Sequence, residues 1–218
     1  MSVISSNVSR ETFDETHDIY SSYKNIFISL IDKWLMWNRS INIMSRRTSR
    51  SDLENHIIHS LLLLNLDNAS TYDMVLDAGS GGGLPGIPLA IVDPGMHYLL
   101  VEKVYKKQLV LKDIIRSLGI SNAEAVVSKV RDISLDQNIR VVSKHAFHIN
   151  NLIDELKSCN WSEINMLKGD DIFDEIKNLS YSEIISHIEI KSISIDHSNF
   201  FQNKYILTIK RKIEPDTS

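Results

Sequence analysis

A glycine-rich segment between two apolar runs constrains the fold more than any other part of this sequence. Residues 74–78 are apolar except for Asp77, four of the next five residues are glycine, and residues 87–92 are again apolar. Such a segment joins a buried strand to a helix, and its backbone N–H groups converge on a ligand beyond the carboxyl end of the strand. We therefore predict an α/β fold with a ligand site at this edge of the sheet.

Short apolar runs alternate with amphipathic segments through most of the remaining chain. This alternation is typical of a parallel sheet covered by helices on both faces. Residues 188–195 and 205–210 indicate two strands joined by the polar loop 197–203 without a helix, which predicts an antiparallel hairpin. We expect a Rossmann-like, seven-stranded, mostly parallel sheet of the class I methyltransferase type. Its other strands are predicted at 74–78, 98–101, 123–127, 140–142 and 164–167, and its helices at 87–92, 106–118, 149–157 and 172–179.

The first part of the chain is expected to form a helical extension. Apolar residues recur at spacings of three and four through 11–37, which predicts one helix, and 53–66 predicts a second. The expected division is residues 1–70 as the helical extension, 71–213 as the sheet domain that binds the cofactor, and 214–218 as a tail.

Composition excludes several classes of protein. The net charge of −4 argues against a basic surface over the whole molecule. There is no run of about 18 apolar residues, so we expect no membrane span. The acidic first 15 residues predict no secretory signal. The lone Cys159, expected in the helical region after the fourth strand, suits a reducing cytoplasm.

Two acidic residues at strand ends indicate the class of ligand. A carboxylate at Asp77 suits the methionine ammonium group of S-adenosylmethionine and would repel the pyrophosphate of a dinucleotide. Leu84 stands where the dinucleotide pattern requires its third glycine. Glu102, at the end of the next strand, is expected to accept hydrogen bonds from both ribose hydroxyls. These residues favour S-adenosylmethionine over a nicotinamide or flavin, with Asp77, Gly79, Gly81, Gly83, Leu84 and Glu102 forming the pocket.

The segment from Gly79 to Ala90 closely resembles the bacterial ribosomal RNA small-subunit methyltransferase G family (RsmG, also called GidB). Further matches in family order cover about residues 30–170, including 37–43, 55–61, 106–107, 128–132, 143–144 and 167–169. The resemblance implies a cytoplasmic enzyme that uses S-adenosylmethionine to methylate N7 of a guanine in 16S ribosomal RNA. Its partner would be this RNA or a partly assembled small subunit. By motif position, the resemblance places Gly79, Leu84, Val130, Arg131 and Lys144 in the cofactor site.

Several residues depart from the family pattern. Arg131 stands where the family usually has an acid, and Lys144, or His145 in another alignment, stands where it has an arginine. Asn55 and His59 replace a common arginine and aspartate. Lysine cannot reproduce the planar two-bond contact of arginine. Two alternatives therefore stay open: a methyltransferase of a protein or small molecule, and a cofactor-binding module without activity.

The implied chemistry needs few catalytic groups. Guanine N7 carries a lone pair and no proton, so no residue is required as a general base. His56, Lys144 and Lys168 are instead expected to position the substrate. His56 and His59 share a helix face but lack a third ligand, so we expect no metal.

A basic segment precedes the second predicted helix. It contains Arg39, Arg46, Arg47 and Arg50 without an acidic residue between them. We expect it to bind RNA phosphates at the mouth of the pocket, and the alternative is an ordinary solvated loop.

Overall fold

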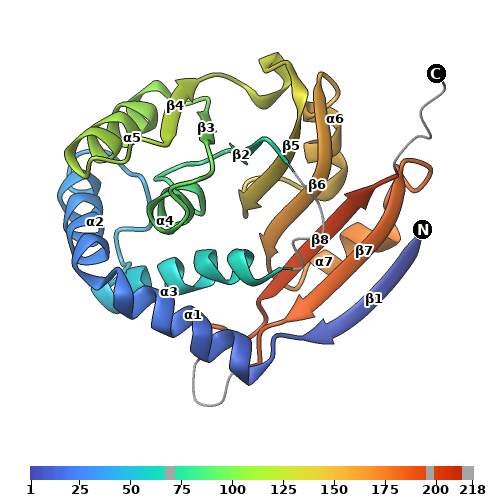
Figure 1. Ribbon diagram of the computed structural model, residues 1–218, viewed down its shortest axis with the longest axis horizontal. Helices are drawn as coiled ribbons and strands as arrows, with labels where there is room; N and C mark the ends of the chain where they lie inside the picture. Colours follow the sequence, from blue (N-terminus) through green and yellow to red (C-terminus); the bar gives the residue numbers. More distant parts are fainter. Residues whose placement is uncertain (67–71, 195–198, 213–218) are drawn as a thin grey trace.

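The computed structural model describes residues 1–66, 72–194 and 199–212. Their strands form an eight-stranded sheet in the order β1-β7-β8-β6-β5-β2-β3-β4 (Figure 1). Strand β8 runs antiparallel to β6 and β7, whereas the other neighbouring strands are parallel. The mostly parallel sheet and its antiparallel hairpin are therefore confirmed. The strands are β1 (Ser2–Asn7), β2 (Met74–Ala78), β3 (Tyr98–Glu102), β4 (Ala123–Val127), β5 (Leu135–Lys144), β6 (Cys159–Lys168), β7 (Ile185–Ser192) and β8 (Tyr205–Arg211).

Helices cover both faces of the sheet and create two separate cores. Helices α1 to α5 pack against one face, where Leu100 and Val142 point toward them. Helices α6 and α7 pack against the other face, where Leu76 and Val141 point. The helices are α1 (Arg10–Ser22), α2 (Lys24–Asn38), α3 (Arg50–Leu61), α4 (Gly86–Val92), α5 (Tyr105–Ser117), α6 (Ile149–Glu155) and α7 (Ile172–Lys177), with 3-10 turns η1 (Leu62–Asn65) and η2 (Val130–Asp132). None of the helices described is both long and apolar enough for a membrane crossing.

The seven-strand prediction is wrong because β1 was not foreseen. All six of its residues are exposed, so it has no buried face and no apolar alternation to reveal it. It joins the sheet through backbone pairing with β7, from Ser2 opposite His187 to Asn7 opposite Ser192.

The single helix predicted over 11–37 is also wrong. The chain leaves the helical conformation at Tyr23, where φ is −105° and ψ is 15°. Phe13 and Tyr20 before this break and Phe27 and Leu30 after it belong to the same core. The apolar spacing therefore continues across the change of direction, and periodicity alone cannot detect it.

Several boundaries differ from the predicted ones. Strands β5 and β6 are each longer than expected, and Cys159 begins β6 instead of lying in a helix. The hairpin strand predicted to Ile195 ends at Ser192. Residues 195–198 and the predicted tail 214–218 lie outside the described residues, and the division into 1–70 and 71–213 stays a prediction.

Candidate active site

The loop between β2 and α4 lies at the carboxyl end of the parallel strands, and its glycines serve different purposes. Gly79, Gly81 and Gly83 have positive φ values of 73°, 56° and 101°. A Cβ at Gly79 would lie 2.7 Å from the Cβ of Ala146, and one at Gly83 would lie 2.5 Å from a side-chain carbon of Ile87. At Gly81 the nearest atom would be the Gly79 carbonyl oxygen, 3.9 Å away. Packing therefore requires Gly79 and Gly83, while Gly81 leaves room for a ligand to approach the backbone.

Asp77 lies behind this loop and not on an open surface. Its side chain is buried, and Oδ2 accepts a hydrogen bond of 2.9 Å from the Gly86 N–H at the start of α4. Burial raises the pKa of the carboxyl to about 7, against the smaller opposing effect of the Gly86 hydrogen bond. Oδ1 has no hydrogen-bond partner among the described residues. Asp77 thus stabilises the start of α4, and Oδ1 is the oxygen left for another group.

Glu102 connects the glycine loop to helix α5. Its Oε2 accepts a hydrogen bond of 2.9 Å from the Gly81 N–H, and Oε1 accepts one of 2.8 Å from the Val104 N–H. Both carboxylate oxygens therefore already accept hydrogen bonds from backbone N–H groups. A ribose hydroxyl would have to donate to their remaining lone pairs. The predicted ribose contact stays a prediction.

A cavity of about 220 Å³ opens beside the loop. It brings together three of the predicted cofactor residues, Gly79, Val130 and Arg131. Its full lining is Gly79, Val101, Lys103, Ser128, Lys129, Val130, Arg131, Ala146, Phe147 and Glu155. The other predicted cofactor residues, Asp77, Gly81, Gly83, Leu84, Glu102 and Lys144, do not line it.

The unusual Arg131 forms an ion pair across this cavity. Its guanidinium pairs with Glu155 of α6, and the Arg131 backbone N–H donates a hydrogen bond of 3.1 Å to the same carboxylate. The cavity wall therefore does contain an acidic residue, but this residue is Glu155 and not the residue at position 131, where the family usually has an acid. Sequence reasoning missed Glu155 because no local pattern links α6 to the turn η2.

A second cluster at the same edge is basic, and its side chains range from the buried His59 to the exposed His145. The Lys144 ammonium at the end of β5 donates a hydrogen bond of 2.6 Å to Nδ1 of His56 on α3. Burial lowers the pKa of Lys144 to about 7 and, with Lys144 and Lys204 nearby, that of His56 to about 3. Burial also lowers the pKa of His145 to about 4. The fully buried His59 has no hydrogen-bond partner for either ring nitrogen within the described part of the chain.

Lys168, at the end of β6, lies in a buried ion-pair cluster. It is almost completely buried, its ammonium pairs with Glu175, and it donates a hydrogen bond of 3.2 Å to the Phe147 carbonyl oxygen. Its expected role in positioning the substrate stays a prediction. His148, Asp171 and Glu175 could together hold a cation, but the Lys168 ammonium already neutralises these carboxylates.

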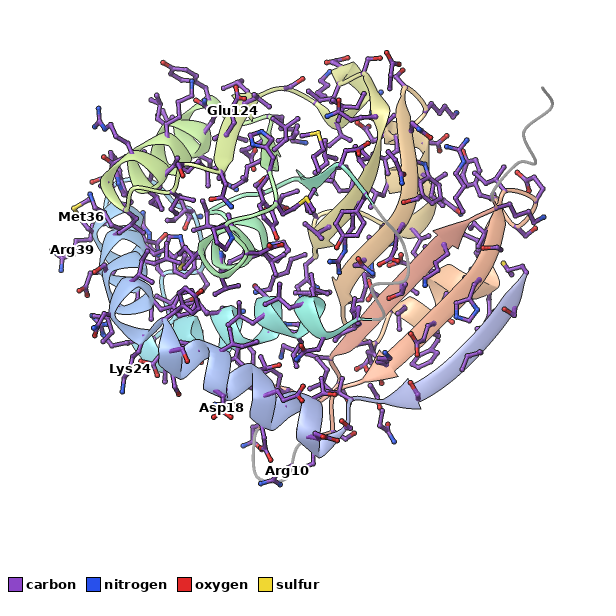
Figure 2. All side chains as sticks on the ribbon, viewed as in Figure 1. Arg10, Asp18, Lys24, Met36, Arg39 and Glu124 are labelled. Carbon is purple, nitrogen blue, oxygen red and sulfur yellow. The ribbon has the colours of Figure 1, made fainter. Side chains whose placement is uncertain are left out.

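The basic segment before α3 packs beside the glycine loop. Trp34 of α2 donates a hydrogen bond of 2.7 Å from Nε1 to the Gly82 carbonyl oxygen, and Ile43 contacts the Gly82 position. Arg39, which directly follows the C-terminal end of α2 and is labelled in Figure 2, is exposed. Arg46 and Arg47 are also exposed, whereas Arg50 pairs with Asp32. The segment thus lies near the site, and its contact with RNA stays a prediction.

Comparison with known proteins identifies the family. Residues 24–205 match the family GidB, described as rRNA small subunit methyltransferase G. The chain belongs to this family. A methyltransferase G from Flavobacterium johnsoniae is 28% identical over 186 residues, covering 82% of this chain and 87% of the relative. One from Chlorobium phaeobacteroides is 45% identical over 97 residues, which is 44% of either chain, so the chain aligns with less than half of that relative.

Solved structures of other proteins have a fold similar to that of this chain. A METTL16 MTase domain has a TM-score of 0.52 at 13% identity, covering 72% of this chain and 66% of that one. M. jannaschii TYW2, solved in complex with AdoMet, has a TM-score of 0.50 at 15% identity, covering 75% of this chain and 76% of that one. At such identities the likeness concerns the fold alone.

Proposed function

We propose that this member of the methyltransferase G family transfers a methyl group from S-adenosylmethionine to N7 of a guanine in 16S ribosomal RNA. The observation that carries the proposal is the family match over residues 24–205, which includes Gly79, Val130 and Arg131 around one cavity. The substrate is this RNA or a partly assembled small subunit, and the place of action is the cytoplasm.

The cavity and the loop have features that suit the cofactor. Gly81 leaves its backbone open, and the wall combines the aromatic Phe147 with the polar Lys103 and Glu155. The volume of about 220 Å³ is smaller than the roughly 300–1,000 Å³ of typical small-molecule sites. The Arg131 side chain on its wall is 62% exposed and pairs with Glu155. When bound, S-adenosylmethionine supplies a methyl group activated by a sulfonium.

The remaining task of the protein is to orient the base and exclude water. Guanine N7 attacks through its own lone pair, so no residue has to remove a proton. Orientation alone can supply several kcal/mol of rate acceleration. Lys144 is the proposed donor to guanine O6, an acceptor that adenine replaces with an amino group. His56 holds the Lys144 ammonium at 2.6 Å and is a positioning residue in this scheme.

Cofactor binding and methyl transfer test separate parts of the proposal. Calorimetry should show that the purified protein binds S-adenosylmethionine in preference to NAD. Labelled methyl groups should pass to small subunits or their RNA, and a Gly81→Val variant, which fills the open position, should lose both cofactor binding and transfer. Transfer to a protein or small molecule instead of RNA would reject the proposed substrate. Cofactor binding without transfer to any acceptor would indicate a binding module.

A further inference from the structure

We propose that helix α5, together with Lys103 two residues before it, forms a docking surface for single-stranded RNA next to the target guanine. The inference rests on the proposed function, because it assumes an RNA substrate. In this scheme the Tyr105 ring stacks on a base and the surrounding lysines bind phosphates. We call this the α5 surface, and it consists of Lys103, Tyr105, Lys106, Leu109, Lys112 and Arg116.

The α5 surface is strongly basic in an acidic protein. Residues 103–116 contain five lysines and arginines but one acidic residue, Asp113, in a chain of net charge −4. Asp113 faces α2, where it accepts a hydrogen bond of 2.8 Å from Trp37 Nε1 and pairs with Lys33 at 3.2 Å. Its remaining oxygen pairs with Arg116 at 3.6 Å. The acid that would neutralise this helix is thus mostly engaged with the neighbouring helix.

The lysines of the α5 surface lack acidic partners among the residues that the structure describes. Within the described residues no carboxylate oxygen lies within 4.0 Å of the ammonium of Lys103, Lys106 or Lys112. Arg50, by contrast, has a partner in Asp32, and Arg131 has one in Glu155. Unpaired surface lysines bind phosphates without first breaking an ion pair, and each phosphate bound releases counterions.

An apolar stripe runs through these lysines. Tyr105 is 62% exposed and Leu109 is 41% exposed, although both are large apolar residues. They are four residues apart, so they lie on one face of the helix, and Lys112 continues this face. The opposite face is buried against the sheet through Val110 and Ile114. Exposed aromatic rings among cations are the combination with which proteins bind single strands, by stacking on bases and pairing with phosphates.

The α5 surface adjoins the candidate active site. Lys103 lines the cavity together with Gly79. Glu102 binds the N–H groups of both Gly81 and Val104, which fixes the start of α5 against the glycine loop. Figure 1 shows α5 beside α2, the helix that precedes the basic segment. A strand of RNA on the α5 surface therefore lies next to the cavity where the methyl group would be transferred.

Binding of a short labelled oligouridine, measured by fluorescence anisotropy, tests the charges. The Lys106→Ala/Lys112→Ala variant removes two cations from the α5 surface. Since a single-strand contact contributes about 0.7 to the slope of log affinity against log salt, the slope should become shallower by about 1.4. The matched control, Lys24→Ala/Lys177→Ala, removes the same charge elsewhere, with Lys24 at the far end of α2 (Figure 2). Equal losses in both variants would overturn the proposal.

Substitution of Tyr105 tests the stacking. Tyr105→Ala should weaken oligouridine binding about tenfold, which corresponds to about 1.4 kcal/mol, a value inside the range for one stacked base. Tyr105→Phe should bind like the parent because it keeps the ring. Calorimetry should give the parent's affinity for S-adenosylmethionine in both variants. If Tyr105→Ala weakens cofactor binding and leaves RNA binding unchanged, the ring belongs to the cofactor site and the proposal is wrong.

Methyl transfer separates this inference from the proposed function. If the parent methylates small-subunit RNA, Lys106→Ala/Lys112→Ala should raise the KM for RNA severalfold and retain kcat. An unchanged KM would reject the α5 surface while leaving the proposed function standing. If the parent methylates no RNA, the proposed function fails, and oligouridine binding still decides whether α5 is an RNA surface.

Discussion

The half-buried His56 should make the protein lose stability in mild acid. Its pKa falls from an ordinary value of 6.5 to about 3, first because of burial and then because of Lys144 and Lys204. Asp52 opposes this shift in the pKa, and His145 adds to it. Because the folded-state pKa is depressed, the unfolded chain takes up the proton first. The stability is therefore fully present above pH 6.5 and is lost progressively as the pH falls from 6.5 toward 3.

The size of the loss follows from the two pKa values. At pH 5 the unfolded histidine is mostly protonated and the folded one is not. The gap of about 1.5 pH units between 6.5 and 5, at about 1.4 kcal/mol per unit, gives about 2 kcal/mol. A His56→Gln variant cannot take up this proton. Its free energy of unfolding should therefore fall by about 2 kcal/mol less than the parent's between pH 7.5 and pH 5.

Urea denaturation of the parent and the variant at the two pH values measures this difference directly. Other titrating groups are present in both proteins, so their effects cancel in the comparison. His97→Gln, a change on an exposed loop, serves as the control and should follow the parent. If His56→Gln loses as much stability as the parent between pH 7.5 and pH 5, the histidine is not held in its neutral form by burial.

Three further predictions concern the glycine loop and its neighbours. Gly83→Ala should cost about 3 kcal/mol of stability by overpacking and positive φ, whereas Gly119→Ala, with positive φ but open space around it, should cost about 1 kcal/mol, both measured by urea denaturation. Trp34→Phe leaves a buried carbonyl oxygen without its donor and should cost about 1–3 kcal/mol in the same assay. Arg46→Ala/Arg47→Ala should flatten the salt dependence of RNA binding by about 1.4 without changing cofactor affinity, and an unchanged slope would mean that the segment is an ordinary solvated loop.

The sheet could be predicted because its strands are buried and apolar. Strand β2 is buried throughout, and the glycines after it marked the turn that leads into α4. Strand β1 could not be predicted, because backbone pairing holds an exposed strand and leaves no apolar pattern. The break at Tyr23 could not be predicted either. The helices on both sides of it bury their apolar faces in the same core, so the apolar pattern continues across the break.

The sequence motifs and the candidate cavity agree for some of the predicted residues. Gly79 and Val130 come from motifs, and both line the cavity. Ion pairs between residues far apart in the sequence, such as Arg131 with Glu155, could not be predicted from the spacing of residues along the chain. Lys168 follows a strand end as predicted, but its accessibility was decided by Glu175 on α7, which the sequence alone could not place.

Nucleoside analysis of small-subunit ribosomal RNA from cells with and without this gene tests the central claim most directly. The account predicts that one 7-methylguanosine is present in RNA from cells with the gene and absent without it. The parent gene should restore it, whereas Gly81→Val should not, because the valine fills the open position in the glycine loop and is strained at a φ of 56°. An unchanged amount of 7-methylguanosine in RNA from cells lacking the gene would contradict the account.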